Sequence, residues 1–170
     1  MYRNYLFITI IMLLISGRSW SQSTVTAQAF AEIIEALTAN ETDQLSFGRF
    51  SPEWGGGNII ITPDGARSSQ GSVLLASGAH SPGRFRVSGA PVSSFTLQLP
   101  QGPAVLINQG TGHTLAVEGW VSDPPAGAVL STLADGSRVI SIGATLSVGP
   151  IDQNPVGLYA GTFQLTFAYN

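Results

Sequence analysis

Turn signals recur at short, regular intervals along most of this chain, and that spacing limits its fold more than any other feature. From Leu45 onward, short runs of β-branched, aromatic and aliphatic residues alternate with clusters of Gly, Pro, Asn and Asp at intervals of roughly 8–12 residues. This rhythm is typical of an antiparallel β-sandwich or barrel, and the frequent Pro residues interrupt any long helix. The sequence therefore predicts an all-β fold with strands in the runs 45–50, 58–62, 72–76, 84–88, 94–99, 104–108, 114–121, 138–148 and 158–169.

Two Asp-Gly pairs separate neighbouring runs and strengthen this prediction. Asp64-Gly65 and Asp135-Gly136 each place residues that tolerate a positive φ between two β-type segments. Such pairs are the strongest short-range signal for a β-hairpin. We therefore expect several antiparallel strand pairs to form between segments that are close in the sequence.

The first 21 residues have the three parts of a secretory signal peptide. Residues 1–5 include one Arg, residues 6–15 are apolar except for Thr9, and residues 16–21 are mostly small and polar. We predict cleavage near Gln22, which leaves residues 22–170 as one domain. The apolar run is shorter than the roughly 20 residues of a membrane helix, so we expect no transmembrane span in the mature form. An uncleaved membrane anchor is the alternative.

Charge is scarce in the mature chain and the balance is acidic. The chain has no Cys and no Lys, and charged residues make up 10% of it, against about 25% in an average soluble domain. After cleavage, five Arg face ten Asp and Glu, a net charge of −5. Disulfides and thiol catalysis are excluded, and nucleic acid is not an expected partner. A surface with so few charges suits a protein that lives in an assembly, although a Ser- and Thr-coated free secreted protein remains the alternative.

Residues that carry chemistry are few and dispersed. His80 and His113 lie in separate turn-like contexts, and the acids of the turns have a sufficient role in capping backbone amides. The three consecutive glycines at 55–57 lack the Lys and helix of a phosphate-binding loop. We therefore expect no enzyme activity, no metal site and no cofactor. Trp54 lies beside the three glycines and Trp120 ends a β-type run. Either ring could stack on a sugar, which keeps a carbohydrate-binding role open.

The start of the mature chain alternates between two kinds of side chain. Residues 27–37 have a composition that also suits a helix of about three turns. The alternation favours an extended strand, because every second residue is small or apolar. The residues on that face are Val25, Ala27, Ala29, Ala31 and Ile33. A strand of this kind, within residues 22–37, fits a narrow groove in another sheet.

The C-terminal run 158–169 alternates in the same way, with one aromatic and apolar face. That face contains Tyr159, Gly161, Phe163, Leu165, Phe167 and Tyr169. The run resembles the last strand of chaperone–usher pilins, which typically have a penultimate Tyr and a Gly about 13 residues before the last residue. Tyr169 and Gly157 occupy those positions. The segment 24–37 is similar to the N-terminal extension of the alternate pilins.

A second resemblance covers nearly all of the mature chain. The chain resembles a family of secreted bacterial proteins classified as a domain of unknown function, and this implies a surface or fimbrial context without enzyme activity. The segments that carry the likeness are Leu45-Ser46-Phe47-Gly48, residues 61–67, residues 142–149, residues 158–163 and Tyr169-Asn170. The chain departs from many pilins because it has no cysteines for their disulfide.

The resemblance to pilins implies an immunoglobulin-like sandwich that lacks one strand and a mechanism of donor-strand exchange. Val25, Ala27, Ala29, Ala31 and Ile33 would be the donor residues. The acceptor groove would comprise Gly157, Tyr159, Phe163, Leu165, Phe167 and Tyr169. Expected partners are copies of the chain or other pilin-like subunits, with a periplasmic chaperone and an usher. Export would lead through the periplasm to the cell surface or medium. The alternative is a self-complete secreted module that binds carbohydrate or another surface.

Overall fold

The computed structural model describes residues 25–170, so the predicted signal peptide and the first three residues of the predicted mature chain lie outside the described residues. Within residues 25–170 the chain forms strands and no helix, in agreement with the predicted all-β class. The strands are β1 (Thr38–Asp43), β2 (Phe50–Ile61), β3 (Arg67–Leu75), β4 (Gly83–Ser88), β5 (Ser94–Gln98), β6 (Ala104–Asn108), β7 (Thr114–Asp123), β8 (Leu130–Ser131), β9 (Ser137–Val148), β10 (Tyr159–Ala160) and β11 (Thr166–Tyr169).

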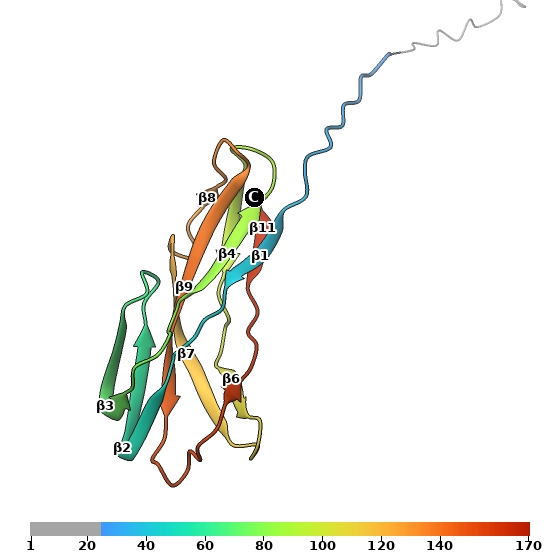
Figure 1. Cartoon of the computed structure of the whole chain (residues 1–170). Helices are drawn as coiled ribbons and strands as arrows, with labels where there is room; N and C mark the ends of the chain where they lie inside the picture. The colour runs from blue at the N-terminus through green and yellow to red at the C-terminus, as the bar shows by residue number, and fades with distance from the viewer. Residues whose placement is uncertain (1–24) are drawn as a thin grey trace, which may run out of the picture. The chain divides into compact units, whose positions relative to one another are not determined.

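The strands form two antiparallel sheets that pack into a sandwich-like fold (Figure 1). The larger sheet has the order β1-β4-β9-β7-β6-β10, with β2 also paired to β9 and β3 paired to β2. The smaller sheet has the order β11-β5-β8. The predicted all-β, antiparallel, sandwich-like fold is therefore confirmed.

Strand β9 organises the larger sheet because it has two partners along one edge. β4 pairs with Ser137 to Ile142, and β2 pairs with Ala144 to Val148. Gly143 lies between the two pairings, and a Cβ there would lie only 2.3 Å from the carbonyl oxygen of Ile61. A glycine at this position therefore lets two strands share one edge of β9.

Two clusters of buried side chains form the core, the first on the larger sheet alone and the second between the two sheets. The first cluster contains Phe47, Ile59, Ile61, Val73, Leu115, Val117, Ala144, Leu146 and Val148. The second contains Val87, Phe95, Leu97, Leu130, Ile140 and Ile142. Trp120 packs against both clusters and links them. The inward-facing residues alternate along β9, as expected for a strand with one face on the core.

The structure differs from the predicted strands at both ends of the chain. The predicted long strand 158–169 is two short strands, β10 and β11, which belong to different sheets. Residues 161–165 between them have no strand pairing. The predicted strand 45–50 is absent, apart from an isolated bridge at Ser46 and the start of β2 at Phe50. The first strand is instead β1 at 38–43, which the sequence pattern did not show because its residues are mostly polar.

The segment before β1 pairs with no strand of the described residues. Residues 25–37 form neither a strand nor the alternative helix. The described residues 25–33 belong to a unit separate from the sandwich, which runs from Ile34 to Asn170. In the first unit, the side chains of Val25, Phe30 and Ile33 are at least 83% exposed.

Candidate functional site

The C-terminal segment 159–169 has a free backbone edge along its whole length. β10 pairs with β6 at the end of the larger sheet, and β11 pairs with β5 at the end of the smaller sheet. Within residues 25–170, no strand pairs with the opposite edge of either β10 or β11. The predicted acceptor segment therefore presents unpaired backbone groups, which is the arrangement that strand addition requires.

The side chains of this segment alternate between the core and solvent. Phe163, Leu165, Phe167 and Tyr169 are partly buried against the second cluster, whereas Tyr159 packs against the first. The ring centroids of Phe163 and Trp120 lie 4.7 Å apart. The structure thus brings four predicted groove residues onto one cluster and leaves each of them partly exposed.

β1 forms the free edge at the other end of the larger sheet, and its inner face is uncovered. Ala39 lies opposite Val87, and Glu41 lies opposite Phe85. Residues opposite one another on paired strands point to the same face of a sheet, and Val87 is fully buried in the second cluster. Ala39 and Glu41 therefore face the interior of the sandwich, yet both are exposed. This combination indicates a missing layer over β1.

β1 and β11 lie next to each other at the end of the sandwich that carries Tyr169 (Figure 1). Leu37, directly before β1, packs against the same cluster as Tyr169. Phe85, on the strand paired with β1, contacts Phe163 edge to face with ring centroids 6.2 Å apart. We call β1 together with residues 159–169 the open edge of the sandwich.

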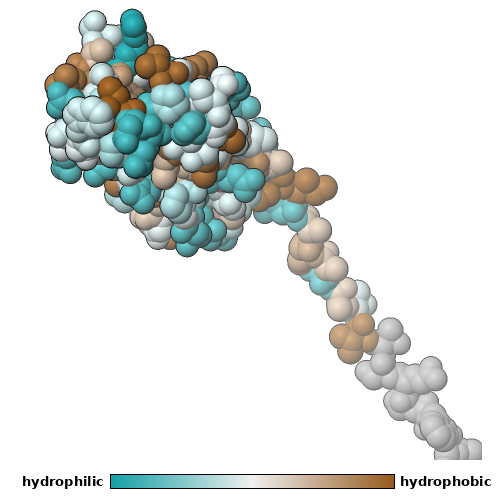
Figure 2. Space-filling view, turned by 90° about the horizontal axis from the view of Figure 1, so that it is seen from below, coloured by the Kyte–Doolittle hydropathy of each residue, from teal (hydrophilic) through white to brown (hydrophobic). Residues whose placement is uncertain are grey.

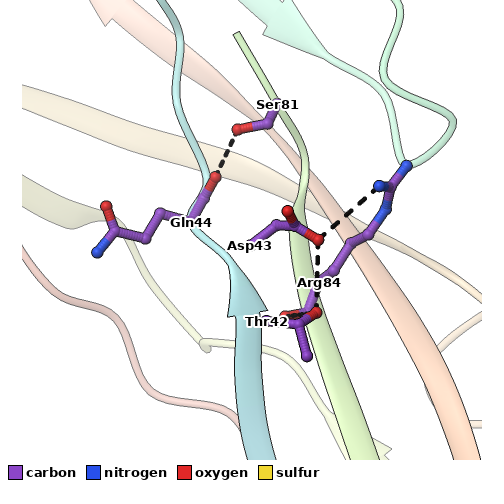
Figure 3. Close-up of polar contacts among 5 residues, drawn as sticks. All are labelled: Thr42, Asp43, Gln44, Ser81 and Arg84. Atoms are coloured by element: carbon purple, nitrogen blue, oxygen red, sulfur yellow. Dashed lines mark hydrogen bonds and ion pairs between the residues drawn. The ribbon is translucent and has the colours of Figure 1, made fainter.

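A polar network fastens β1 to the larger sheet where its pairing becomes irregular (Figure 3). The Arg84 guanidinium lies 3.8 Å from the Asp43 carboxylate. The Ser81 hydroxyl donates to the carbonyl of Gln44 at 2.7 Å, and the Thr42 hydroxyl donates to the carbonyl of Arg84 at 3.2 Å. The ion pair is half exposed, so its contribution is about 0–1 kcal/mol, and the network serves mainly to fix the position of the edge.

Gly157 has a structural role that the sequence pattern did not show. A Cβ at Gly157 would lie 2.5 Å from Nδ2 of Asn108, a buried side chain. Asn108 Nδ2 donates to the carbonyl of Pro155 at 3.2 Å, and its Oδ1 accepts from the amides of Gly110 and Thr111. Gly157 therefore lies beside the network that holds the chain just before β10, and it does not line the partly buried aromatic face.

Gly161 lets the C-terminal segment cross from one sheet to the other. A Cβ at this position would lie 2.1 Å from the carbonyl oxygen of Val105, on β6. No side chain fits so close to a backbone oxygen, so the segment can pass β6 only with glycine here. The alternation of residues 158–169 puts Gly161 on the aromatic face. A glycine among aromatic residues is the sequence feature that could have indicated this crossing.

The predicted donor residues belong to a unit separate from the sandwich. Within the described residues before β1, Ala27, Ala29 and Ala31 are exposed together with the apolar side chains of Val25 and Ile33. Their role as donors stays a prediction.

The histidines have only local contacts. His80 Nδ1 lies 3.5 Å from the carbonyl of Gly78, and His113 Nδ1 lies 3.2 Å from the Thr111 hydroxyl. Across residues 25–170, the structure contains no group of three or more His, Asp or Glu side chains arranged for a metal ion. In the same part of the chain, no helix has the length and apolar character needed to span a membrane.

Two exposed aspartates have lowered pKa values, and local hydrogen bonds are the main cause. The hydroxyl of Thr62 donates to the Asp64 carboxylate and, with the Ala66 amide, lowers the pKa of Asp64. The amide of Ser137 and then its hydroxyl lower the pKa of Asp135. Asp64 lies in the hairpin turn between the paired strands β2 and β3, as predicted. Asp135 lies in a turn between β8 and β9, which belong to different sheets, so no hairpin forms there. Local hydrogen bonds within the two turns account for both shifts.

The two tryptophans of the predicted mature chain have different surroundings. Trp54 is 77% exposed in an irregular part of β2. Trp120 is partly buried, and its Nε1 donates to the carbonyl of Gly102 at 3.2 Å. A shallow depression beside Trp120 is lined by residues 99–103 and 118–120. Trp54 is therefore the tryptophan whose ring is more available to a ligand.

Comparison with family models gives a match over most of the chain. A family model described as a domain of unknown function (DUF4402) matches residues 37–169. No curated protein matches the chain. The matched region begins at Leu37 and therefore covers the sandwich, including both parts of the open edge.

Proposed function

We propose that this chain, which belongs to the DUF4402 family, is a structural surface subunit of pilin-like type that assembles into fimbriae by donor-strand exchange. The observation that carries the proposal is the open edge. β1 exposes inward-facing residues, and residues 159–169 expose unpaired backbone beside them. A strand inserted between the two would complete the sandwich.

The N-terminal segment has the properties of that strand. Its apolar face is small, so Ala27, Ala29 and Ala31 would fit between β1 and the aromatic side chains of the C-terminal segment. Apolar burial contributes about 25 cal/mol per Å², and each ladder hydrogen bond contributes about 1 kcal/mol. A donated strand would thus stabilise the acceptor by several kcal/mol, and the lone subunit would keep an edge prone to association.

The expected partners follow from the same edge. Neighbouring copies, or other pilin-like subunits, would supply the donor strand, and a periplasmic chaperone and usher would cover the edge before assembly. The predicted signal peptide supports export through the inner membrane to the periplasm and then to the cell surface, where adhesion is the expected role. The local contacts of His80 and His113 support a role without catalysis.

The test uses the full mature chain, residues 22–170, expressed with export to the periplasm. Ala29→Asp would place a carboxylate on the donor face, where burial in a neighbour is costly. Gln28→Asp, on the opposite face, adds the same charge and is the matched control. Gel filtration and negative-stain microscopy should show oligomers or fibres for the parent and Gln28→Asp proteins, and monomers for Ala29→Asp. Monomers from all three proteins would reject the proposal.

The exposure of Trp54 favours a second candidate function. A flat aromatic ring that is 77% exposed is suited to stacking on a sugar. On this hypothesis the chain is a secreted module that binds carbohydrate or another surface as a monomer. Binding of glycans by a monomeric parent protein, lost in Trp54→Ala, would support this function over assembly.

A further inference from the structure

We propose that the subunits also touch end to end, through an apolar surface around Trp54 on one copy and a surface around Val92 and Leu133 on the next. This inference rests on the proposed function, because the donated strand brings the two surfaces together. It goes further by naming which ends meet and in which direction the donor strand runs.

The short connection between donor and body makes such a contact necessary. Tyr169 holds the Glu35 carbonyl through a 2.9 Å hydrogen bond, so the sandwich begins to fix the chain at Glu35. The last donor residue, Ile33, is two residues earlier. An extended chain spans at most about 3.6 Å per residue, or about 7 Å for this step. When Ile33 pairs in a neighbour, its own sandwich must therefore lie against that neighbour.

The direction of the donor decides which end of the neighbour is touched. Donor residues 25–33 would cover about 30 Å, close to the length of the acceptor segment 159–169. An antiparallel donor brings Ile33 near residue 159, whereas a parallel donor brings it near residue 169. The parallel case places like ends together and permits two copies to exchange strands in a closed dimer. The antiparallel case joins unlike ends and propagates.

The end near residue 159 has the surface that an antiparallel donor needs. The loop between β9 and β10 exposes Ile151, Val156 and Leu158, with Val156 fully exposed. The amide of Ile151 donates to the carbonyl of Glu53 at 3.3 Å, which places this loop beside Trp54. Figure 2 looks onto this end of the sandwich and shows apolar side chains gathered toward one side of it. We call Trp54, Ile151, Val156 and Leu158 the Trp54 surface.

The end from which the donor segment leaves has a complementary apolar surface. Val92 and Leu133 are exposed and adjacent, since the Val92 amide donates to the Leu133 carbonyl at 3.4 Å. Val92 also has a φ of 55°, a conformation that is unfavourable for a β-branched residue. Its side chain is 73% exposed, so burial within its own sandwich offsets little of this strain. Contact with a neighbour's Trp54 surface would bury it.

The absence of Cys from the whole sequence makes a direct cross-linking test possible. Three forms of the mature chain are prepared: Leu133→Cys alone, Val156→Cys alone, and the double variant. Each is oxidised after assembly and run on a denaturing gel without reductant. The double variant should give a ladder of covalent oligomers, and each single variant should give fewer than one tenth as many cross-links. The ladder should disappear when Ala29→Asp is added.

The outcomes separate this inference from the proposed function. In one outcome, assembly depends on Ala29 but the Leu133→Cys variant alone gives cross-linked dimers. This result would overturn the end-to-end contact and leave the strand-exchange proposal intact. Monomers throughout would reject both. As a second measurement, Trp54→Asp should raise the concentration needed for assembly at least tenfold. The control Val121→Asp, on the outer face of the larger sheet, should leave it unchanged, and an equal effect of both substitutions would contradict a specific surface.

Discussion

The hydroxyl of Tyr169 donates a 2.9 Å hydrogen bond to the backbone carbonyl of Glu35, 134 residues earlier in the chain. The same oxygen accepts a 2.9 Å hydrogen bond from the amide of Ala90. Gly89 leaves room for it, because a Cβ there would lie 2.2 Å from the Tyr169 oxygen. One phenol group therefore joins the C-terminal strand, the β4–β5 turn and the base of the N-terminal segment.

Tyr169→Phe should lower the free energy of unfolding by about 1–3 kcal/mol, because the ring still packs while the Ala90 amide loses its partner. Urea unfolding followed by circular dichroism measures this, in an Ala29→Asp background that keeps the protein monomeric if the proposal holds. Tyr159→Phe, which removes one bond to the Pro155 carbonyl, is the control and should cost about 1 kcal/mol. Unchanged stability in Tyr169→Phe would contradict a clamp at this position.

Asn108→Ala should destabilise the sandwich by about 3 kcal/mol, since three hydrogen bonds of a buried amide are lost together. Asn108→Asp keeps the acceptor for the two loop amides but cannot donate to Pro155 while ionised. The loss in free energy of unfolding of Asn108→Asp, relative to the parent, should shrink as the pH falls toward 4 and the buried carboxyl becomes protonated. Urea unfolding at pH 7 and pH 4 checks both variants, and a deficit in Asn108→Asp that grows in acid would contradict this account.

Asp135 should contribute to stability in a pH-dependent way. Hydrogen bonds from Ser137 lower its pKa, so the contribution is present above the unfolded-state pKa of about 3.9 and is lost as the pH falls through the lower folded-state value. Asp135→Asn should therefore lose less stability than the parent between pH 5 and pH 2. Thermal unfolding across that range measures the difference. Identical curves for Asp135→Asn and the parent would refute the linkage.

Glu41→Val should increase non-specific association of the subunit. Glu41 faces the interior side of β1 beside Phe85, where a charge discourages edge-to-edge pairing. Light scattering at matched concentrations in the Ala29→Asp background measures the effect apart from strand exchange. Asn40→Val, on the outer face of the same strand, adds the same side chain and should scatter less. Equal scattering by the two variants would show that the inner face has no special role.

Much of the fold could be predicted because the turn chemistry is explicit. The Asp64 turn connects the paired strands β2 and β3 as expected, and the long run that became β9 was recognised from its apolar residues. The predicted hairpin at Asp135 was wrong, because this turn leads from β8 in the smaller sheet to β9 in the larger sheet. β1 was missed because its polar composition hides an edge strand. β8 was missed because a strand of two residues has no recognisable pattern. The break in the C-terminal run was missed because alternation continues through residues 161–165 although the pairing partner changes from β6 to β5.

The candidate site was predicted in part. The alternation correctly placed four residues on one cluster: Phe163, Leu165, Phe167 and Tyr169. Every second side chain still points to the core after the chain passes from one sheet to the other. Asn108 and Trp120 were not assigned to this region, since Asn108 is 47 positions from Pro155 and Trp120 is 43 positions from Phe163, and such contacts leave no local pattern. Glu41 could be placed on the inner face only after its pairing with Phe85 was known.

The crossing of the C-terminal segment between sheets ties the two clusters together. Tyr159 packs against the first cluster, and Phe163, Leu165, Phe167 and Tyr169 pack against the second. One short segment therefore contributes to both halves of the core, so displacing it should loosen the two sheets together.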